Sequence, residues 1–175
     1  MGILAAVIVA ATFGLPVVLV GGERTLAEFL RVTRNGSTVT GMARGIHSRP
    51  SLLDLERIGR AVVSDHVADL TAAAQDTLFA RLRSQQAVTG LLGCWHAAAT
   101  RTPELLVVER SLAMAARAVA DGRYVEPSDE SEDPDVIDDA VDDLIERVLQ
   151  SGGYVCIAPD GTLRDHGRVA LSLAS

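Results

Sequence analysis

The sequence predicts an α/β fold in two small lobes, and three observations lead to that prediction. Apolar runs of strand length recur along the chain, at about 16–21, 104–109, 153–158 and 168–173. Between them lie longer segments in which apolar residues keep helical spacing. The 175 residues, 48% hydrophobic and 22% charged, are enough for one good core or two small ones. Uniformly apolar strands that alternate with helices are typical of a sheet covered by helices.

The first lobe begins with a strand that passes into a helix. The apolar run at 16–21 is closed by a Gly pair, and Thr25 with Glu28 three positions later predicts a capped helix. An Asn-Gly pair then predicts a turn, followed by a short strand at 37–40 and a loop over 41–50.

A second capped helix follows in the first lobe. Ser51 with Asp54 has the spacing of a capping box. Apolar residues keep helical spacing from position 52, and this continues with little interruption through Leu82. We therefore expect one long helical stretch after residue 50.

The N-terminal residues 1–22 carry no charge, which raises a membrane-spanning segment as an alternative. Two features favour a place in the protein core. No Lys or Arg precedes the run, and Gly14 and Pro16 interrupt its second half. We therefore expect a helix over about 3–12, a tight turn and a buried strand, with no membrane contact.

The second lobe alternates helices and strands. Helices are predicted over about 88–99 and, in an Ala-rich stretch, over 111–120, on either side of the 104–109 strand. An acidic loop over 121–135 leads to an amphipathic helix over 136–148, whose first turns carry carboxylates that the helix dipole favours. The last two apolar runs then close the lobe.

Charge is segregated along the chain. The net charge is −7, and the segment from Asp121 to Glu146 holds twelve acids and one Arg, so that the remainder is positive. Within it, Pro127–Pro134 has the low hydrophobicity and high charge of a disordered loop. Its acids lack the central Gly and the terminal Glu of an EF-hand, so we expect no calcium there.

Five Arg residues and one His gather in the first lobe, in a window with only two acids. Arg side chains match the geometry of phosphate oxygens, and the release of counterions drives such binding. This set is the candidate RNA-binding site, and an ordinary solvated surface is the alternative. Its members are Arg24, Arg31, Arg34, Arg44, His47 and Arg49.

No arrangement of residues predicts catalysis, a cofactor or a metal. The four His residues lack the spacing of a zinc site, and no nucleophile elbow, P-loop or dinucleotide fingerprint occurs. Cys94 and Cys156 form no secretory framework, which predicts a reduced, cytoplasmic protein. The alternative is a small ligand-binding or enzymatic domain with its site at the strand end near Gly21.

Parts of both lobes resemble a known family, the archaeo-eukaryotic class-1 release factor and Pelota family, in its Balon-like bacterial branch. The resembling segments are Leu15–Leu30, Ala43–Ser51, Gly153–Gly161 and Gly167–Leu173. The resemblance implies that residues 1–66 are the back half of the family's middle domain. It also implies that residues 67–175 are the last domain, a small α/β sandwich akin to a ribosomal RNA-binding fold.

The resemblance implies a function without catalysis. The family's peptide-releasing members carry a Gly-Gly-Gln tripeptide, but here one Gly pair precedes Glu23 and the other precedes Tyr154. We therefore expect a translation-associated protein that binds the ribosome or a ribosome-docked partner, in hibernation or stress. We expect the basic set to contact ribosomal RNA, and we expect no DNA partner.

Overall fold

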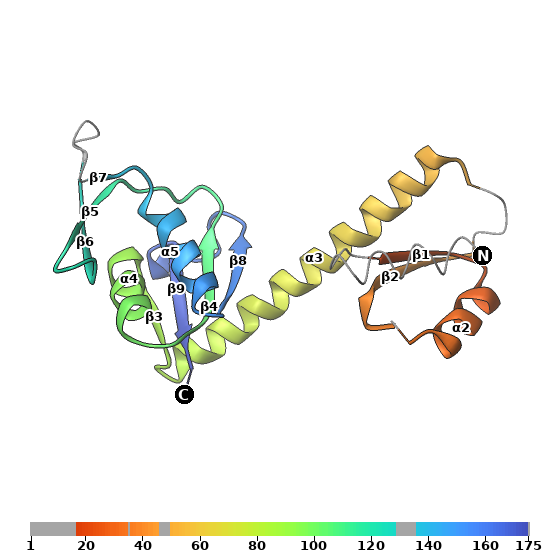
Figure 1. Ribbon diagram of the computed structural model, residues 1–175, viewed down its shortest axis with the longest axis horizontal. Coiled ribbons are helices and arrows are strands. Elements are labelled where there is room, and N and C mark those ends of the chain that lie inside the picture. The colour runs from red at the N-terminus through yellow and green to blue at the C-terminus, as the bar shows by residue number, and fades with distance from the viewer. Residues whose placement is uncertain (1–16, 35, 46–49, 129–135, 175) are drawn as a thin grey trace. The chain divides into compact units, whose positions relative to one another are not determined.

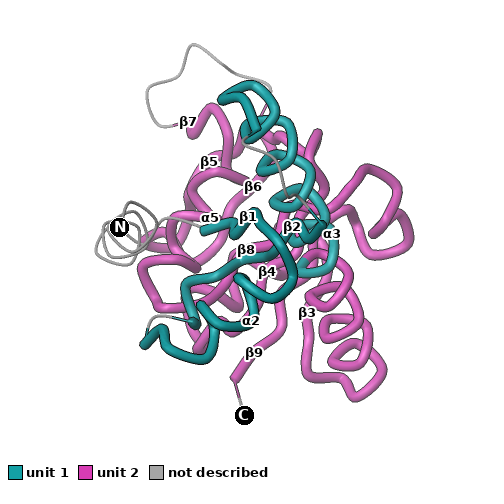
Figure 2. The backbone as a smooth tube through the Cα atoms, turned by 90° about the vertical axis from the view of Figure 1, so that its right-hand side faces the viewer, with its two compact units in different colours: residues 1–70 teal, residues 71–175 magenta. Residues whose placement is uncertain are grey.

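A computed structural model describes residues 17–34, 36–45, 50–128 and 136–174 (Figure 1). It confirms the predicted α/β class, with helices and three separate sheets. The chain divides into two compact units, residues 1–70 and residues 71–175 (Figure 2). The predicted helix at 3–12 lies outside the described residues, as does most of the 1–22 run. The sequence placed the lobe boundary near residue 66, and the two units meet after Leu70, inside helix α3 (Leu52–Arg83).

Unit 1 contains a parallel pair of strands, β1 (Val17–Gly21) and β2 (Val39–Arg44). Helix α2 (Glu23–Val32) and the short 3₁₀ turn η1 (Gly36–Thr38) connect them. Leu26 of α2 packs against Leu19 of β1, and both are buried. The predicted first strand is therefore confirmed. Leu26 and Phe29, three residues apart, lie on the same side of α2 and pack against the sheet.

Three local predictions in unit 1 differ from the structure. The strand predicted over 37–40 begins at Val39, because the two residues before it belong to η1. Thr25 does not cap α2, because the helix already begins at Glu23 and its N-cap is Gly22, which offers no side-chain oxygen. The loop predicted over 41–50 begins as a strand, because residues 41–44 pair with β1. Pairing with a distant strand decides this assignment, and local composition does not reveal it.

The capping box at the start of α3 is confirmed. The Asp54 backbone N–H donates to Ser51 Oγ at 3.2 Å, and the Ser51 backbone N–H donates to Asp54 Oδ2 at 3.3 Å. The Ser51 hydroxyl, 2.6 Å from the same carboxylate oxygen, lowers the pKa of Asp54 below its ordinary value. Two otherwise unpaired backbone donors are thereby satisfied.

Unit 2 is built on a four-stranded mixed sheet in the order β3–β9–β4–β8. The strands are β3 (Ala87–Thr89), β4 (Pro103–Glu109), β8 (Tyr154–Ala158) and β9 (Val169–Leu173). β4 pairs parallel with β8 and antiparallel with β9. The three strand runs predicted for the second lobe are therefore confirmed. The fourth strand, β3, was missed because its three residues are too few to show a period.

Helices cover both faces of this sheet. On one face, Leu78 of α3 packs with Val107 of β4 and Ala170 of β9. On the other face, α4 (Leu91–Thr100) and α5 (Ala140–Gln150) pack onto neighbouring strand positions such as Leu106. Both clusters contain fully buried side chains, which explains why the central residues Leu105–Val108 of β4 are all apolar.

A second sheet in unit 2 replaces several predicted elements. Strands β5 (Ala116–Val119), β6 (Tyr124–Pro127) and β7 (Val136–Ile137) form it in the order β6–β5–β7. The helix predicted over 111–120 is therefore wrong, because Ala-rich β5 pairs on both sides. The first part of the predicted acidic loop is the β5–β6 turn and β6. The remainder, 129–135, lies outside the described residues.

Helix boundaries in unit 2 also differ from prediction. The helix expected over 136–148 begins at Ala140, where the Asp139 carboxylate accepts from the Val141 backbone N–H at 2.9 Å. The helix expected over 88–99 begins at Leu91, after β3. In both cases the first residues of the predicted helix belong to a short strand, β7 before α5 and β3 before α4.

Candidate functional site

The structure places four members of the predicted basic set on or near α2 and β2. Arg24 and Arg31 lie on α2, seven residues apart and so on one side of the helix. Arg34 follows the end of α2, and Arg44 is the last residue of β2. All four are exposed. We call them the basic surface; His47 and Arg49 lie outside the described residues.

The ion pairs of the basic surface are weak. The Arg31 guanidinium contacts Glu28 at 2.8 Å, and Arg44 lies 3.8 Å from Glu23. All these side chains are more than half exposed, and such pairs contribute about 0–1 kcal/mol to stability. Arg24 and Arg34 form no ion pair with a described residue within 4.0 Å. The guanidinium groups are therefore accessible to an anionic partner.

A small hollow of about 150 Å³ lies beside the basic surface, near the strand end where the sequence placed an alternative site. Leu26, Leu30 and Met42 line it together with Ala27, and Glu23 and Arg44 complete it. Gly21 pairs in register with Arg44 at the ends of β1 and β2. The lining contains no nucleophile beside a general base, so it has no evident hydrolytic chemistry.

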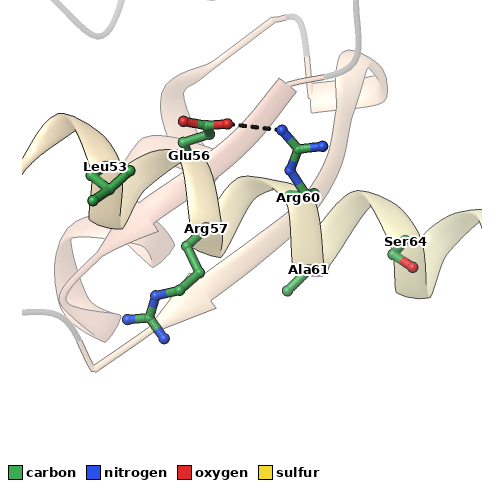
Figure 3. A pocket seen from close by; sticks show the side chains of 6 residues that line it. All are labelled: Leu53, Glu56, Arg57, Arg60, Ala61 and Ser64. Atoms are coloured by element: carbon green, nitrogen blue, oxygen red, sulfur yellow. Dashed lines mark hydrogen bonds and ion pairs between the residues drawn. The ribbon is translucent and has the colours of Figure 1, made fainter.

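A larger open hollow, of about 560 Å³, lies along α3 (Figure 3). Figure 3 shows Glu56 and Arg60 joined by an ion pair of 2.8 Å, with Arg57 extending to the opposite side. Ser64 is the lone hydroxyl among the described lining residues, and the one carboxylate there, Glu56, is paired with Arg60. No sequence pattern indicated this hollow, because the exposure of the apolar Leu53 side chain at its end is visible only in the structure.

Among the described residues of unit 2, one carboxylate is buried, and no sequence pattern indicated it. Glu109 ends β4 with a side chain only 2% exposed. Its Oε1 accepts from the Leu163 backbone N–H at 2.7 Å, and its Oε2 accepts from Arg168 Nε at 3.0 Å. Burial raises the pKa of the Glu109 carboxyl, but these hydrogen bonds together lower it below its ordinary value. The sequence feature that could have indicated this buried acid is its position directly after the apolar run Leu105–Val108.

Arg168 joins this carboxylate to the neighbouring loop. Its Nη2 donates to Ser111 Oγ at 2.6 Å and lies 3.4 Å from Asp160 Oδ1. The Ser111 backbone N–H, 3.0 Å from the same oxygen, lowers the pKa of Asp160. We call Glu109, Ser111, Asp160 and Arg168 the carboxylate–arginine network. Both of its acids are ionised and paired, so it joins the loops after β4 and β8 and offers no free acid or base.

A second set of contacts fixes the β5–β6 turn. Trp95 Nε1 donates to the Gly122 carbonyl at 2.9 Å, and Arg147 Nη1 donates to the same oxygen at 3.2 Å. The Arg147 guanidinium lies 4.2 Å from the Trp95 ring centroid. His96 stacks on Tyr124, with ring centroids 4.4 Å apart. These side chains tie the small sheet to α4 and α5.

Among the described residues, the remaining chemistry-bearing side chains show no reactive arrangement. Burial raises the pKa of the Cys94 thiol to about 12, and it raises the pKa of Cys156 as well, so neither is a ready thiolate. In the part of the chain that the structure describes, no three His, Cys, Asp or Glu residues are placed to hold a metal ion. None of its helices combines the length and apolar character that crossing a bilayer requires.

Comparison with solved structures identifies similar folds. Ribosome-bound archaeal Pelota, solved with ABCE1, matches with a TM-score of 0.55 at 19% identity, over 90% of this chain and 43% of that one. Dom34 from S. cerevisiae matches with a TM-score of 0.52 at 11% identity, over 90% and 46%. The C-terminal domain of a peptide chain release factor from Methanosarcina mazei matches with a TM-score of 0.50 at 15% identity. That match covers 72% of this chain and 96% of the release-factor domain. The chain shares their fold.

These matches bear out the coarse resemblance seen in the sequence. The match to an isolated C-terminal domain supports the assignment of a Pelota-like C-terminal α/β domain. The chain spans less than half the length of the Pelota and Dom34 chains. No protein-family model and no curated protein matches the sequence. The bacterial branch and the exact portion of the middle domain stay predictions.

Proposed function

We propose that this chain is a cytoplasmic, translation-associated protein that binds the ribosome or a partner docked on it. The observation that carries the proposal is the shared fold. One similar structure is a Pelota bound to the ribosome with ABCE1, and another is Dom34, a translation termination-like factor that interacts with Hbs1. A role in hibernation or stress is the finer form of the same proposal, supported by the resemblance to the bacterial branch.

The basic surface is our candidate for the contact with RNA. Its guanidinium groups are exposed and form at most weak pairs with exposed acids. Arg24 and Arg31 lie on one side of α2, separated by about 10 Å along the helix axis. Such a spacing suits two phosphates of one RNA backbone, because Arg contacts to phosphates position a protein without reading sequence.

We further infer that the chain binds without catalysis. Its sequence contains no Gly-Gly-Gln. The Glu109 and Asp160 carboxylates are held by Arg168 and backbone donors. Ester hydrolysis needs a positioned water and a stabilised developing charge. Neither the hollows nor the carboxylate–arginine network supplies that combination.

The test is co-sedimentation with purified ribosomes at increasing salt. We expect binding to weaken steeply with salt, because released counterions contribute the driving force. Arg31→Ala with Arg34→Ala should weaken it, whereas the control pair Arg101→Ala with Arg123→Ala removes the same charge from exposed positions in unit 2 and should retain it.

Two results would contradict the proposal. Equal loss in both double variants would remove the basic surface as the contact, and no sedimentation of the wild-type chain at low salt would remove ribosome binding. The same ribosomes, loaded with peptidyl-tRNA, test the absence of catalysis: multiple-turnover peptide release by this chain alone would overturn it.

A further inference from the structure

β8 is an edge strand without the usual protection of an edge. It pairs with β4 on one side, from Leu105 opposite Tyr154 to Glu109 opposite Ala158. On its other side it pairs with no strand among the described residues. Natural sheets protect their edges with charges, Pro or very short strands. The five residues Tyr154–Ala158 contain neither a charge nor a Pro, whereas the opposite edge, β3, has only three residues.

Apolar side chains remain exposed along β8. Tyr154 is 76% exposed and Ile157 is 44% exposed. Successive side chains of a strand point to opposite faces, so these two lie on different faces of the sheet. Between them, Val155 packs against the cluster under α4 and α5, and Cys156 packs against the cluster under α3. The strand is therefore anchored at Val155, Cys156 and the fully buried Ala158, and it is exposed at Tyr154 and Ile157.

We propose that β8 pairs with β8 of a second copy of this chain. The two strands run antiparallel about a two-fold axis at Cys156, so that two four-stranded sheets become one continuous sheet. Edge-to-edge pairing of this kind satisfies the outer backbone N–H and C=O groups of both strands. The interface is isologous, which is the commonest form of a homodimer.

The residue sizes in β8 complement one another in this register. Residues whose numbers are equally far from position 156 lie opposite each other and on the same face. Tyr154 therefore lies opposite Ala158 of the partner subunit, the smallest residue of β8, so that no second large side chain is opposed to it. The Ala158 side chain is itself fully buried within its own subunit. Ile157 faces Val155 of the partner subunit, an apolar pair that stabilises sheets.

The charges also permit self-pairing. The nearest charged residue after the strand is Asp160, and in this register it faces Gly152 of the partner subunit, so no like charges are opposed. A charged peptide would gain no counter-charge from Tyr154–Ala158. A second copy brings a strand that is as uncharged as the first, although the whole chain carries −7.

Sedimentation equilibrium tests the proposal. We expect a wild-type dimer and a monomer for Ile157→Lys, because a Lys on an edge strand blocks further pairing. The matched control is Leu92→Lys on α4, which introduces the same side chain at a position of similar exposure, 47% against 44%. It should remain a dimer. Circular dichroism verifies that each variant is folded, and Tyr154→Lys serves as a second edge variant.

Oxidative cross-linking tests the register. Directly opposed residues of antiparallel strands have Cα atoms about 4.5–5.5 Å apart, within the range that a disulfide bridges. An oxidant at alkaline pH, chosen because burial raises the pKa of Cys156, should give a covalent dimer that peptide mapping assigns to Cys156. A monomeric wild type, equal dissociation by Ile157→Lys and Leu92→Lys, or a dimer that does not cross-link at Cys156 would overturn the proposal.

Discussion

Unit 2 and unit 1 differ in how much of their apolar surface is buried. In unit 2 the central strands carry fully buried side chains on both faces, such as Leu106 on one and Val107 on the other. Among the described residues of unit 1, Leu19 and Leu26 are the buried pair, and they form one small cluster with their partly buried neighbours. Stability is therefore concentrated in unit 2, because buried apolar area is the main favourable term in folding.

The two units also differ in what their charged residues do. In unit 2 the Glu109 carboxylate is buried and has defined donors, so that it stabilises loops. In unit 1 the charges of the basic surface are exposed and their ion pairs contribute little. The Glu109 set therefore has a structural role, and the exposed basic surface remains our proposed contact with RNA.

The largest effect is expected from cavities in the two cores. Leu106→Ala removes a fully buried side chain of β4 and should lower the free energy of unfolding of unit 2 by roughly 2–5 kcal/mol. Leu26→Ala should cost less, because Leu26 also lines the hollow beside α2 and its removal leaves a cavity open to water. Amide hydrogen exchange, measured separately on β4 and β1, distinguishes the two. Equal losses would contradict the difference between the units.

A smaller effect is expected where β2 meets α3 inside unit 1. A Cβ at Gly41 would overlap the Val62 side chain, which is β-branched and cannot move aside easily. Gly41→Ala should therefore destabilise unit 1 by about 1–3 kcal/mol. The control is Gly59→Ala on α3, where a Cβ meets nothing within 4 Å and should stabilise the helix by about 0.5–1 kcal/mol. Chemical denaturation of both variants measures the contrast, and destabilisation by both would refute it.

A third effect is expected from Glu109→Gln, which keeps the side-chain shape and an acceptor for the Leu163 N–H but removes the charge that pairs with Arg168. At neutral pH it should cost the stability that the ionised carboxylate contributes. The folded-state pKa values of Glu109 and Asp160 are lowered from ordinary values of 4.5 and 3.8. The stability they contribute is therefore present above those values and is lost as pH falls through the folded-state values. Urea midpoints of the wild type should fall as pH drops below about 4.5. The urea midpoint of Glu109→Gln should fall less over the same pH range. An identical pH profile for the two proteins would argue against a role of the Glu109 ionisation.

The strands and the cap of α3 could be predicted because their signals are local. The runs around Leu19, Val107 and Ala170 are mostly apolar. In unit 2 the reason is that clusters of buried side chains lie on both faces of the sheet. Ser51 and Asp54 cap α3 through bonds that span three residues, so the sequence contains both partners of each bond. The short strands β3, β5 and β6 lack such a signal. β3 exists because β9, distant in the sequence, pairs with it. β5 and β6 pair with each other across a short turn and β5 also pairs with β7, so here the pairing overrides the helical preference of an Ala-rich stretch.

The candidate sites likewise have features that the sequence shows and features that only the structure shows. The physical reason is the distance in sequence between the interacting groups. The sequence alone determined that the positive charge lies outside the acidic segment and that several Arg residues gather before position 50. Only the tertiary structure decided that Glu109 is buried against Arg168, because that contact joins residues 59 positions apart. Only the sheet order left β8 at an edge, since a strand's neighbours depend on how the whole chain returns to the sheet.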